Sequence, residues 1–118
     1  MYRDEILDHY KRPRNTGTLE TEFQAEGENS SCGDDTKVFV EVEDGKLSKI
    51  RHETHGCAIS TAGISIISKE LKEKNIDEVK NFGEDWMLET LGVEISPMRK
   101  KCAMLGLKTV QKALEETS

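Results

Sequence analysis

Alternating hydrophobic and polar positions mark the middle of the chain. Valines occupy every second position of residues 38–42, and a period of two is typical of a β-strand. Asp44 and Gly45 follow, a pair that favours a tight hairpin turn. Apolar positions return over residues 47–54, so we expect a second strand antiparallel to the first. A weaker pattern over residues 20–26 predicts a third strand at the edge of the sheet.

Elsewhere apolar residues recur every three or four positions, the period of an amphipathic helix. Helices are predicted over residues 3–10, 58–74 and 98–116, with one or two further short helices within residues 76–92. Residues 27–35 are rich in Gly, Asn, Ser and Asp and are predicted to form a loop. The expected apolar side of the first helix consists of Ile6, Leu7 and Tyr10.

This order of elements predicts an α+β fold in which a small antiparallel three-stranded sheet packs against helices. With 118 residues the chain is long enough for one hydrophobic core. Neither a repeat nor a linker interrupts the pattern. We therefore expect a single domain over residues 1–118.

Charge narrows the classes of partner. The chain carries 17 Lys and Arg against 23 Asp and Glu, a formal net charge of −6, which argues against general nucleic-acid binding because that depends on neutralising phosphates. Apolar runs such as Val38–Val40 are far too short to span a bilayer. The first residues lack the charged-then-apolar pattern of a signal peptide. We expect a cytoplasmic protein with no membrane partner.

Three cysteines, Cys32, Cys57 and Cys102, carry the candidate chemistry. An odd number of thiols cannot pair off completely, and disulfides are rare in the cytosol. Their spacing does not match a tandem CxxC zinc ribbon. Together with Asp34, however, three soft ligands and one carboxylate suit a four-coordinate metal or cluster site.

The local setting of each cysteine supports this interpretation. Gly33 lets the backbone turn, so that the side chains of Cys32 and Asp34 can converge. Cys57 and Cys102 each lie near a predicted helix start, where the helix dipole favours the thiolate that binds metal. The alternative is three inert cysteines in the core. That alternative is weakest for Cys32, whose polar neighbours could not line a core.

The histidines are weaker candidates than Asp34 for a fourth ligand. We expect His9 to pack or cap rather than ligate, and His52 to face solvent from its strand. His55 lies two residues from Cys57 and is expected to support a ligand by hydrogen bonding rather than to bind metal itself.

Four segments resemble the IscU/SufU/NifU-type iron–sulfur cluster assembly scaffolds. Residues 31–34 (Ser-Cys-Gly-Asp) and 56–60 (Gly-Cys-Ala-Ile-Ser) resemble the first and second cysteine motifs of that family, and residues 97–102 correspond to the third. The resemblance covers nearly the whole chain. The N-terminal signature is matched by Tyr2-x-x-x-Ile6-x-Asp8-His9-Tyr10-x-x-Pro13-Arg14-Asn15-x-Gly17.

The resemblance implies a scaffold rather than an enzyme, with sulfurtransferase activity left open. Such a scaffold builds a [2Fe–2S] cluster on Cys32, Cys57 and Cys102, with Asp34 as the weaker oxygen ligand that eases release. The implied partners are a cysteine desulfurase that delivers persulfide sulfur, an electron donor such as ferredoxin, and recipient apoproteins; a homodimer is left open. Zn²⁺ or Fe²⁺ is the alternative occupant of the same site.

Two departures from the family pattern affect this interpretation. Lys101 stands where the IscU branch has a histidine before the third cysteine, and a protonated lysine cannot ligate. Instead, Lys101 with Arg99 and Lys100 is expected to favour the Cys102 thiolate, which makes Cys102 the expected persulfide acceptor. Residues 95–99 also differ from the Leu-Pro-Pro-Val-Lys segment of chaperone-using members.

The lack of that histidine resembles the SufU branch, whose members bind zinc and accept sulfur. That branch carries an insertion between its second and third cysteines, for which this chain has no room. We therefore favour the cluster scaffold and keep a zinc-dependent sulfurtransferase as the alternative. A purely structural zinc module fits worst, because an Asp ligand and cationic neighbours suit an inert closed site poorly.

Overall fold

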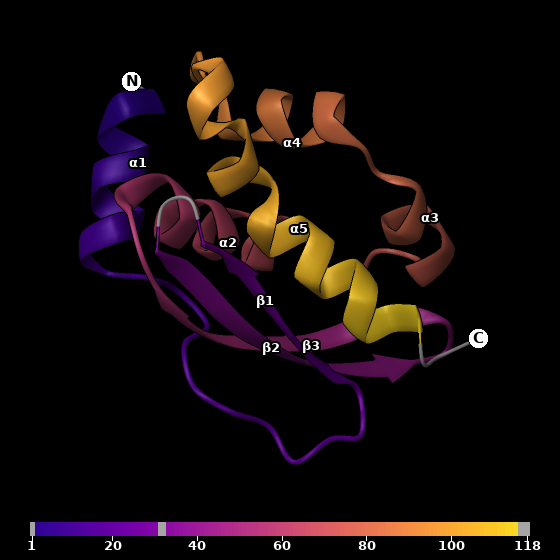
Figure 1. Cartoon of the computed structure of the whole chain (residues 1–118). Coiled ribbons are helices and arrows are strands. Elements are labelled where there is room, and N and C mark those ends of the chain that lie inside the picture. Colours follow the sequence, from indigo (N-terminus) through magenta and orange to yellow (C-terminus); the bar gives the residue numbers. More distant parts are fainter. Residues whose placement is uncertain (1, 31–32, 116–118) are drawn as a thin grey trace.

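The computed structural model describes residues 2–30 and 33–115 and shows a three-stranded sheet with helices on one face (Figure 1). Cys32, a predicted ligand, lies outside the described residues. The elements in chain order are α1 (Tyr2–Lys11), β1 (Gln24–Asn29), β2 (Asp34–Glu43), β3 (Lys46–His55), α2 (Ala58–Glu70), α3 (Ile76–Asn81), α4 (Glu84–Leu91), the 3₁₀ helix η1 (Pro97–Arg99) and α5 (Lys100–Leu114).

The sheet is antiparallel throughout, with the strand order β1-β2-β3. Asp44 and Gly45 form the hairpin turn between β2 and β3, with φ angles of 52° and 74°. Positive φ at both central residues is the geometry of a type I′ turn, which Asp-Gly favours. The predicted hairpin and the predicted α+β fold class are confirmed.

β1 ends later and β2 begins earlier along the chain than predicted. β1 begins at Gln24 rather than at residue 20 and continues to Asn29, and β2 already begins at Asp34. Residues 27–29 and 34–35 were predicted as loop, and that prediction is wrong. Their backbones pair in register, Gly27 with Thr36 and Asn29 with Asp34, because ladder hydrogen bonds use main-chain groups whatever the side chain.

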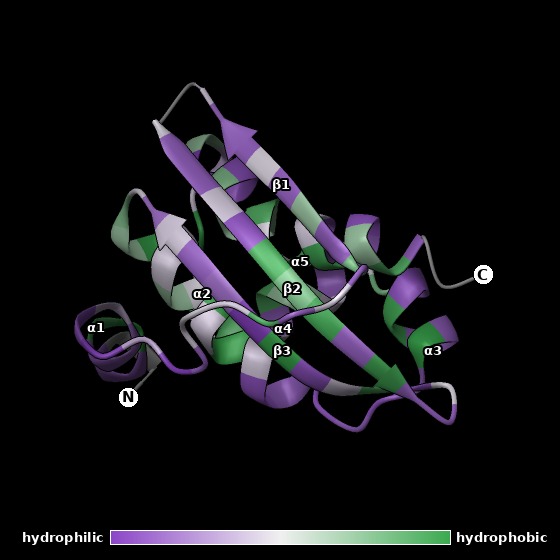
Figure 2. Cartoon of the chain, turned by 90° about the horizontal axis from the view of Figure 1, so that it is seen from below, coloured by the Kyte–Doolittle hydropathy of each residue, from purple (hydrophilic) through white to green (hydrophobic). Residues whose placement is uncertain are grey.

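Helices α2, α4 and α5 lie behind the sheet in Figure 2, which looks onto the opposite face. That opposite face is crossed by the segment that joins α1 to β1 (Figure 2). The segment is tied to β2, where the Val40 N–H donates to the Phe23 carbonyl at 2.9 Å. The largest fully buried apolar side chains belong to one hydrophobic core: Leu47, Ile50, Ile64, Ile67, Leu71, Met87, Leu91, Leu107, Leu114, Val38 and Val40.

Helix α1 packs against α2 through Ile6 and His9, which are 6% and 5% exposed. His9 Nδ1 lies 2.7 Å from Ser65 Oγ, and burial lowers the pKa of His9. The packing role expected for His9 is confirmed. Leu7 and Tyr10 are 45% and 44% exposed, so the prediction that they share the apolar side with Ile6 is wrong. Residues three apart on one helix face, Ile6 and His9, make the contact instead.

His52 is buried, at 1% exposure, and the expectation that it faces solvent is wrong. It pairs with Val38 and lies two residues after Ile50, so it points to the helix-covered side of the sheet, where its ring Nε2 lies 2.8 Å from the carbonyl oxygen of Arg14. Desolvation lowers the pKa of His52, although the hydrogen bond with the Arg14 carbonyl acts in the opposite direction.

The remaining helices follow the predictions with changes at their ends. α2 stops at Glu70 rather than 74 because the chain turns back to the sheet, where the Leu47 N–H donates to the Lys74 carbonyl at 2.9 Å. α3 and α4 are the two short helices expected within residues 76–92. The final helix is preceded by the 3₁₀ turn η1, which begins at Pro97. Within residues 2–30 and 33–115, every helix is too short or too polar to cross a membrane.

Candidate metal centre

Asp34 opens β2, and its side chain points to the helix-covered side of the sheet. Alternation along the strand places it on the same side as Thr36 and Val38, and all three are buried. Its exposure is 2%. A carboxylate at this position needs partners, because burying a charge without compensation is unfavourable.

Cys57 supplies two of those partners from the start of α2. It is the N-cap residue, in extended conformation, and its N–H donates to Asp34 Oδ1 at 2.8 Å. Its thiol lies 3.8 Å from Asp34 Oδ2, and the Ser60 hydroxyl is 3.7 Å from the same sulfur. The backbone donor and the positive end of the helix both favour negative charge at this position. The prediction that Cys57 lies at a helix start is confirmed.

Gly56 makes the approach of Asp34 to Cys57 possible. Its φ is +153°, a value that residues with a side chain rarely adopt. A Cβ at Gly56 would lie 2.2 Å from Asp34 Oδ1 and 2.9 Å from Asp34 Cα. The carboxylate of Asp34 therefore occupies the space that a side chain at position 56 would need.

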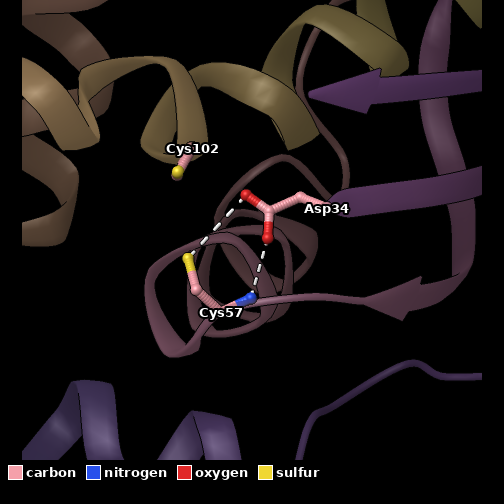
Figure 3. A group of neighbouring side chains, drawn as sticks. All are labelled: Asp34, Cys57 and Cys102. Atoms are coloured by element: carbon pink, nitrogen blue, oxygen red, sulfur yellow. Dashed lines mark hydrogen bonds between the residues drawn. The ribbon is translucent and has the colours of Figure 1, made fainter. Parts of the chain in front are cut away.

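Cys102 comes from the first turn of α5, as its sequence position predicted, and is fully buried. Its sulfur faces Asp34 and Cys57 (Figure 3). One ligand atom from each of Asp34, Cys57 and Cys102 lies within 4.8 Å of the others. Among the described residues this is the one such group of three or more Cys, His, Asp and Glu side chains.

These donors fit a thiophilic metal ion. Zinc and iron take thiolate sulfur at about 2.3 Å and carboxylate oxygen at about 2.0–2.2 Å, so donors up to 4.8 Å apart can reach one ion with small side-chain movements. The structure brings together three of the four predicted ligands. Cys32 is two residues before Asp34, in the connection between β1 and β2, and its role as a ligand stays a prediction.

Lys101 is exposed, whereas the neighbouring Lys100 forms an ion pair with Glu84 at 3.3 Å. Arg99, the N-cap residue of α5, is exposed too. The cations expected to act on Cys102 thus surround the start of the helix at the surface. Activation of the Cys102 thiolate by Lys101 stays a prediction.

His55 lies outside the cluster of ligand atoms. It is exposed at the end of β3, and its Nδ1 is 3.3 Å from Asp35 Oδ1. The structure therefore gives it a partner next to the site rather than one in it.

Asn29 and Gly56 are the residues of the site that the sequence analysis did not single out. The Asn29 side-chain amide donates to Cys102 Sγ at 3.5 Å. The sequence predicts a loop at residue 29, and only the register of β1 reveals that its side chain faces inward. Gly56 carried a signal, since it directly precedes a cysteine at a strand end, but its contact with Asp34 joins distant parts of the chain.

The family model for the NifU-like N-terminal domain matches residues 1–117. The chain belongs to this family. It is 30% identical to the iron–sulfur cluster assembly scaffold protein IscU 1 of Archaeoglobus fulgidus, covering 97% of this chain and 74% of that protein. It is also 30% identical to the zinc-dependent sulfurtransferase SufU of Bacillus subtilis, covering 97% and 89%. With Escherichia coli IscU it shares 28% identity over 98% and 92%.

Solved structures agree with this membership. The crystal structure of FiSufU from Fervidobacterium islandicum AW-1, a candidate cluster assembly scaffold of the SUF system, aligns with a TM-score of 0.79 and 29% identity over 94% of both chains. A NifU-like N-terminal protein from Brucella abortus aligns with a TM-score of 0.77 at 19% identity, covering 99% and 96%, which supports the fold alone. The resemblance to IscU/SufU/NifU-type scaffolds is thus confirmed.

Proposed function

We propose that this protein is a scaffold on which a [2Fe–2S] cluster is assembled from iron and desulfurase-derived sulfur and from which the cluster passes to recipient apoproteins. The proposed ligands are Cys32, Asp34, Cys57 and Cys102. The cluster is the cargo of the scaffold rather than a resident cofactor. The observation that carries the proposal is the convergence of Asp34, Cys57 and Cys102, with ligand atoms within 4.8 Å, in a member of this family.

The hydrogen bonds around Asp34 support a role in release. Asp34 Oδ1 accepts the Cys57 N–H, while Oδ2 faces the Cys57 sulfur. One carboxylate oxygen is thereby held by the protein and the other is left to bind metal. Oxygen is a harder and weaker ligand than thiolate for iron, so this position is the one that exchanges first.

Sulfur is proposed to enter through Cys102. Its thiolate attacks the outer sulfur of a desulfurase persulfide, so that a new S–S bond forms on Cys102 and the desulfurase cysteine leaves as a thiolate. The transferred sulfur must then be reduced to sulfide, for which an electron donor such as ferredoxin is the proposed partner. Cys102 is fully buried in the first turn of α5, so docking of the desulfurase has to move this turn or its surroundings to expose the sulfur.

A second candidate function is zinc-dependent sulfur transfer. The name of the Bacillus subtilis relative describes it as a zinc-dependent sulfurtransferase, and the cysteine and carboxylate donors fit Zn²⁺ as well as Fe²⁺. Lys101 in place of a histidine favours this alternative. In it, zinc would be held by the same four residues, and the chain would accept and pass on persulfide sulfur.

The remaining predictions concern organisation. The family match over residues 1–117 supports a single scaffold domain. The cytoplasmic location and the lack of nucleic-acid and membrane partners stay predictions. Whether the chain forms a homodimer is left open.

Anaerobic purification followed by absorption spectroscopy and metal analysis tests the proposal. We expect visible bands, with iron and acid-labile sulfide in equal amounts. The Cys57→Ser variant should lose the bands, whereas His55→Gln, which changes an exposed neighbour outside the ligand group, should keep them. A colourless protein with one zinc per chain would favour the sulfurtransferase. A protein that takes up neither cluster nor zinc on reconstitution would contradict both.

A further inference from the structure

Asn29 brings a polar side chain into the interior beside Cys102. It is the last residue of β1, a strand in which exposed and more buried side chains alternate. Asn29 is on the more buried side and is 9% exposed. A buried amide is unfavourable unless it is hydrogen-bonded. Its Nδ2 donates to Cys102 Sγ at 3.5 Å, within the range of hydrogen bonds to sulfur.

Asn29 and Asp34 are cross-strand partners at the end of the β1–β2 pair. Both side chains point to the site, but they face different sulfurs. Asp34 meets Cys57, and Asn29 meets Cys102. The end of β1 and the start of β2 therefore place a neutral donor beside one thiol and an acceptor beside the other.

A hydrogen bond from an amide to a thiolate has a known electronic effect. It draws electron density from the sulfur, and partners of this kind tune a metal site through its ligands. The bond is also stronger when the sulfur is anionic than when it is a thiol, because charge-assisted hydrogen bonds are the strong ones.

We infer that Asn29 is a positioning residue of the site, whose side-chain amide fixes the Cys102 sulfur toward Asp34 and withdraws electron density from it when it binds metal. This inference rests on the proposed function in its second half, the effect on a bound metal. Its first half, the contact with the sulfur, can be tested in the metal-free protein.

NMR of the metal-free protein tests the contact. Substituting Cys102→Ala removes the acceptor, so the side-chain amide proton signals of Asn29 should shift. The Gln24 side chain is exposed at the other end of β1 and donates to the Thr21 carbonyl at 2.9 Å, so its amide signals serve as an internal control and should not move. Asn29 signals that are unchanged by Cys102→Ala would overturn the inference.

Cobalt(II) as a probe metal tests the electronic effect, because its charge-transfer bands report the electron density on thiolate ligands. Asn29→Leu and Asn29→Asp both remove the donor at similar volume. In both variants we expect the sulfur-to-cobalt band to shift to longer wavelength than in the wild type. Gln24→Glu makes the same amide-to-acid change far from the site and should leave the band in place.

The outcomes separate this inference from the proposed function. Weaker cobalt binding with an unshifted band in both Asn29 variants would mean that Asn29 only supports the fold, and would overturn the inference. A wild-type protein that binds no cobalt would contradict the proposed function and, with it, the electronic half of the inference. The NMR result would still decide the contact.

Discussion

Gly56 and Asp34 are in such close contact that the site depends on the absence of a side chain at position 56. A Cβ there would lie 2.2 Å from Asp34 Oδ1. Asp34 is held in this place by the N–H of Cys57, the residue that follows Gly56. The glycine thus sets the distance between the carboxylate and the start of α2.

Replacing this glycine should disturb the site more than the fold. We expect Gly56→Ala to displace Asp34 and to weaken the binding of Co²⁺ or Zn²⁺ by about 10- to 100-fold, the range seen when groups that support metal ligands are lost. Isothermal titration calorimetry measures the affinity.

Gly45→Ala is the matched control for that substitution. Gly45 also has a positive φ, of 74°, but nothing lies within 4 Å of its added Cβ. Both variants should lose stability through backbone strain, by roughly 1 kcal/mol or more, while only Gly56→Ala should lose metal affinity. Equal metal affinities in the two variants would show that the contact between position 56 and Asp34 does not control metal binding.

Asp34 is predicted to be the labile ligand. Asp34→Ala should leave a cluster that persists longer and is transferred severalfold more slowly, because the exchangeable oxygen ligand is lost. The rate of transfer to an apo-ferredoxin, followed by circular dichroism, measures this. Asp35→Ala is the control, since Asp35 is the exposed neighbour of Asp34. Transfer from Asp34→Ala at the wild-type rate would exclude a role of Asp34 in release.

Cys102 is predicted to carry the persulfide after incubation with desulfurase and cysteine, as detected by mass spectrometry. Lys101→Ala should slow its formation severalfold, because the cation favours the thiolate and its approach to an acidic partner surface. Without desulfurase, exposure decides which thiol reacts first. Iodoacetamide should then modify half-buried Cys57 before fully buried Cys102.

Lys108→Ala provides the control for Lys101, because Lys108 is an exposed lysine further along α5. It should accept sulfur at the wild-type rate. Persulfide found mainly on Cys32 or Cys57, with Cys102→Ser still accepting sulfur at full rate, would rule out Cys102 as the first acceptor.

His9 should make stability depend on pH. Burial lowers the pKa of His9 below 6.5, so as the pH falls below about 6.5 the unfolded chain takes up a proton that the folded chain does not. The contribution of neutral His9 to the free energy of unfolding should therefore be fully present above that pH. It should decrease from about pH 6.5 toward pH 5. His52, whose pKa is also lowered, adds to the decrease in the same direction.

Urea unfolding at several pH values tests the contribution of His9. His9→Gln keeps a polar side chain opposite Ser65 but does not titrate, so the decrease should become smaller in that variant. His55→Gln, at an exposed position, should leave the decrease as it is. A pH dependence that is the same in His9→Gln as in the wild type would contradict the prediction.

The sequence predicted the features that rest on local chemistry. The turn at Asp44 and Gly45 follows from their tolerance of positive φ, and the place of Cys57 at the start of α2 follows from the change of hydrophobic period after it. Cys102 at the start of α5 was predictable for the same reason. Local patterns of this kind need no knowledge of the rest of the fold.

What the sequence did not predict depends on contacts between distant segments. His52 is buried because it pairs with Val38 and follows Ile50 by two residues, on the helix-covered side of the sheet. The sequence does not show that the distant Arg14 carbonyl would be there as a partner for its ring. The exposure of Leu7 and Tyr10 depends on which face of α1 meets α2. Asn29 reads as a loop residue until its pairing with Asp34 is known.

Asp34, Cys57 and Cys102 come from a strand and two helices, so their ligand atoms converge only when β2, α2 and α5 are packed together. Any ion that binds all three is therefore bound by the folded chain and not by the unfolded one, which links metal occupancy to the folding equilibrium. At a free ion concentration 100 times the dissociation constant, this linkage adds about 2.7 kcal/mol to the free energy of unfolding. When the metal is transferred to a recipient, the chain returns to the less stable metal-free form.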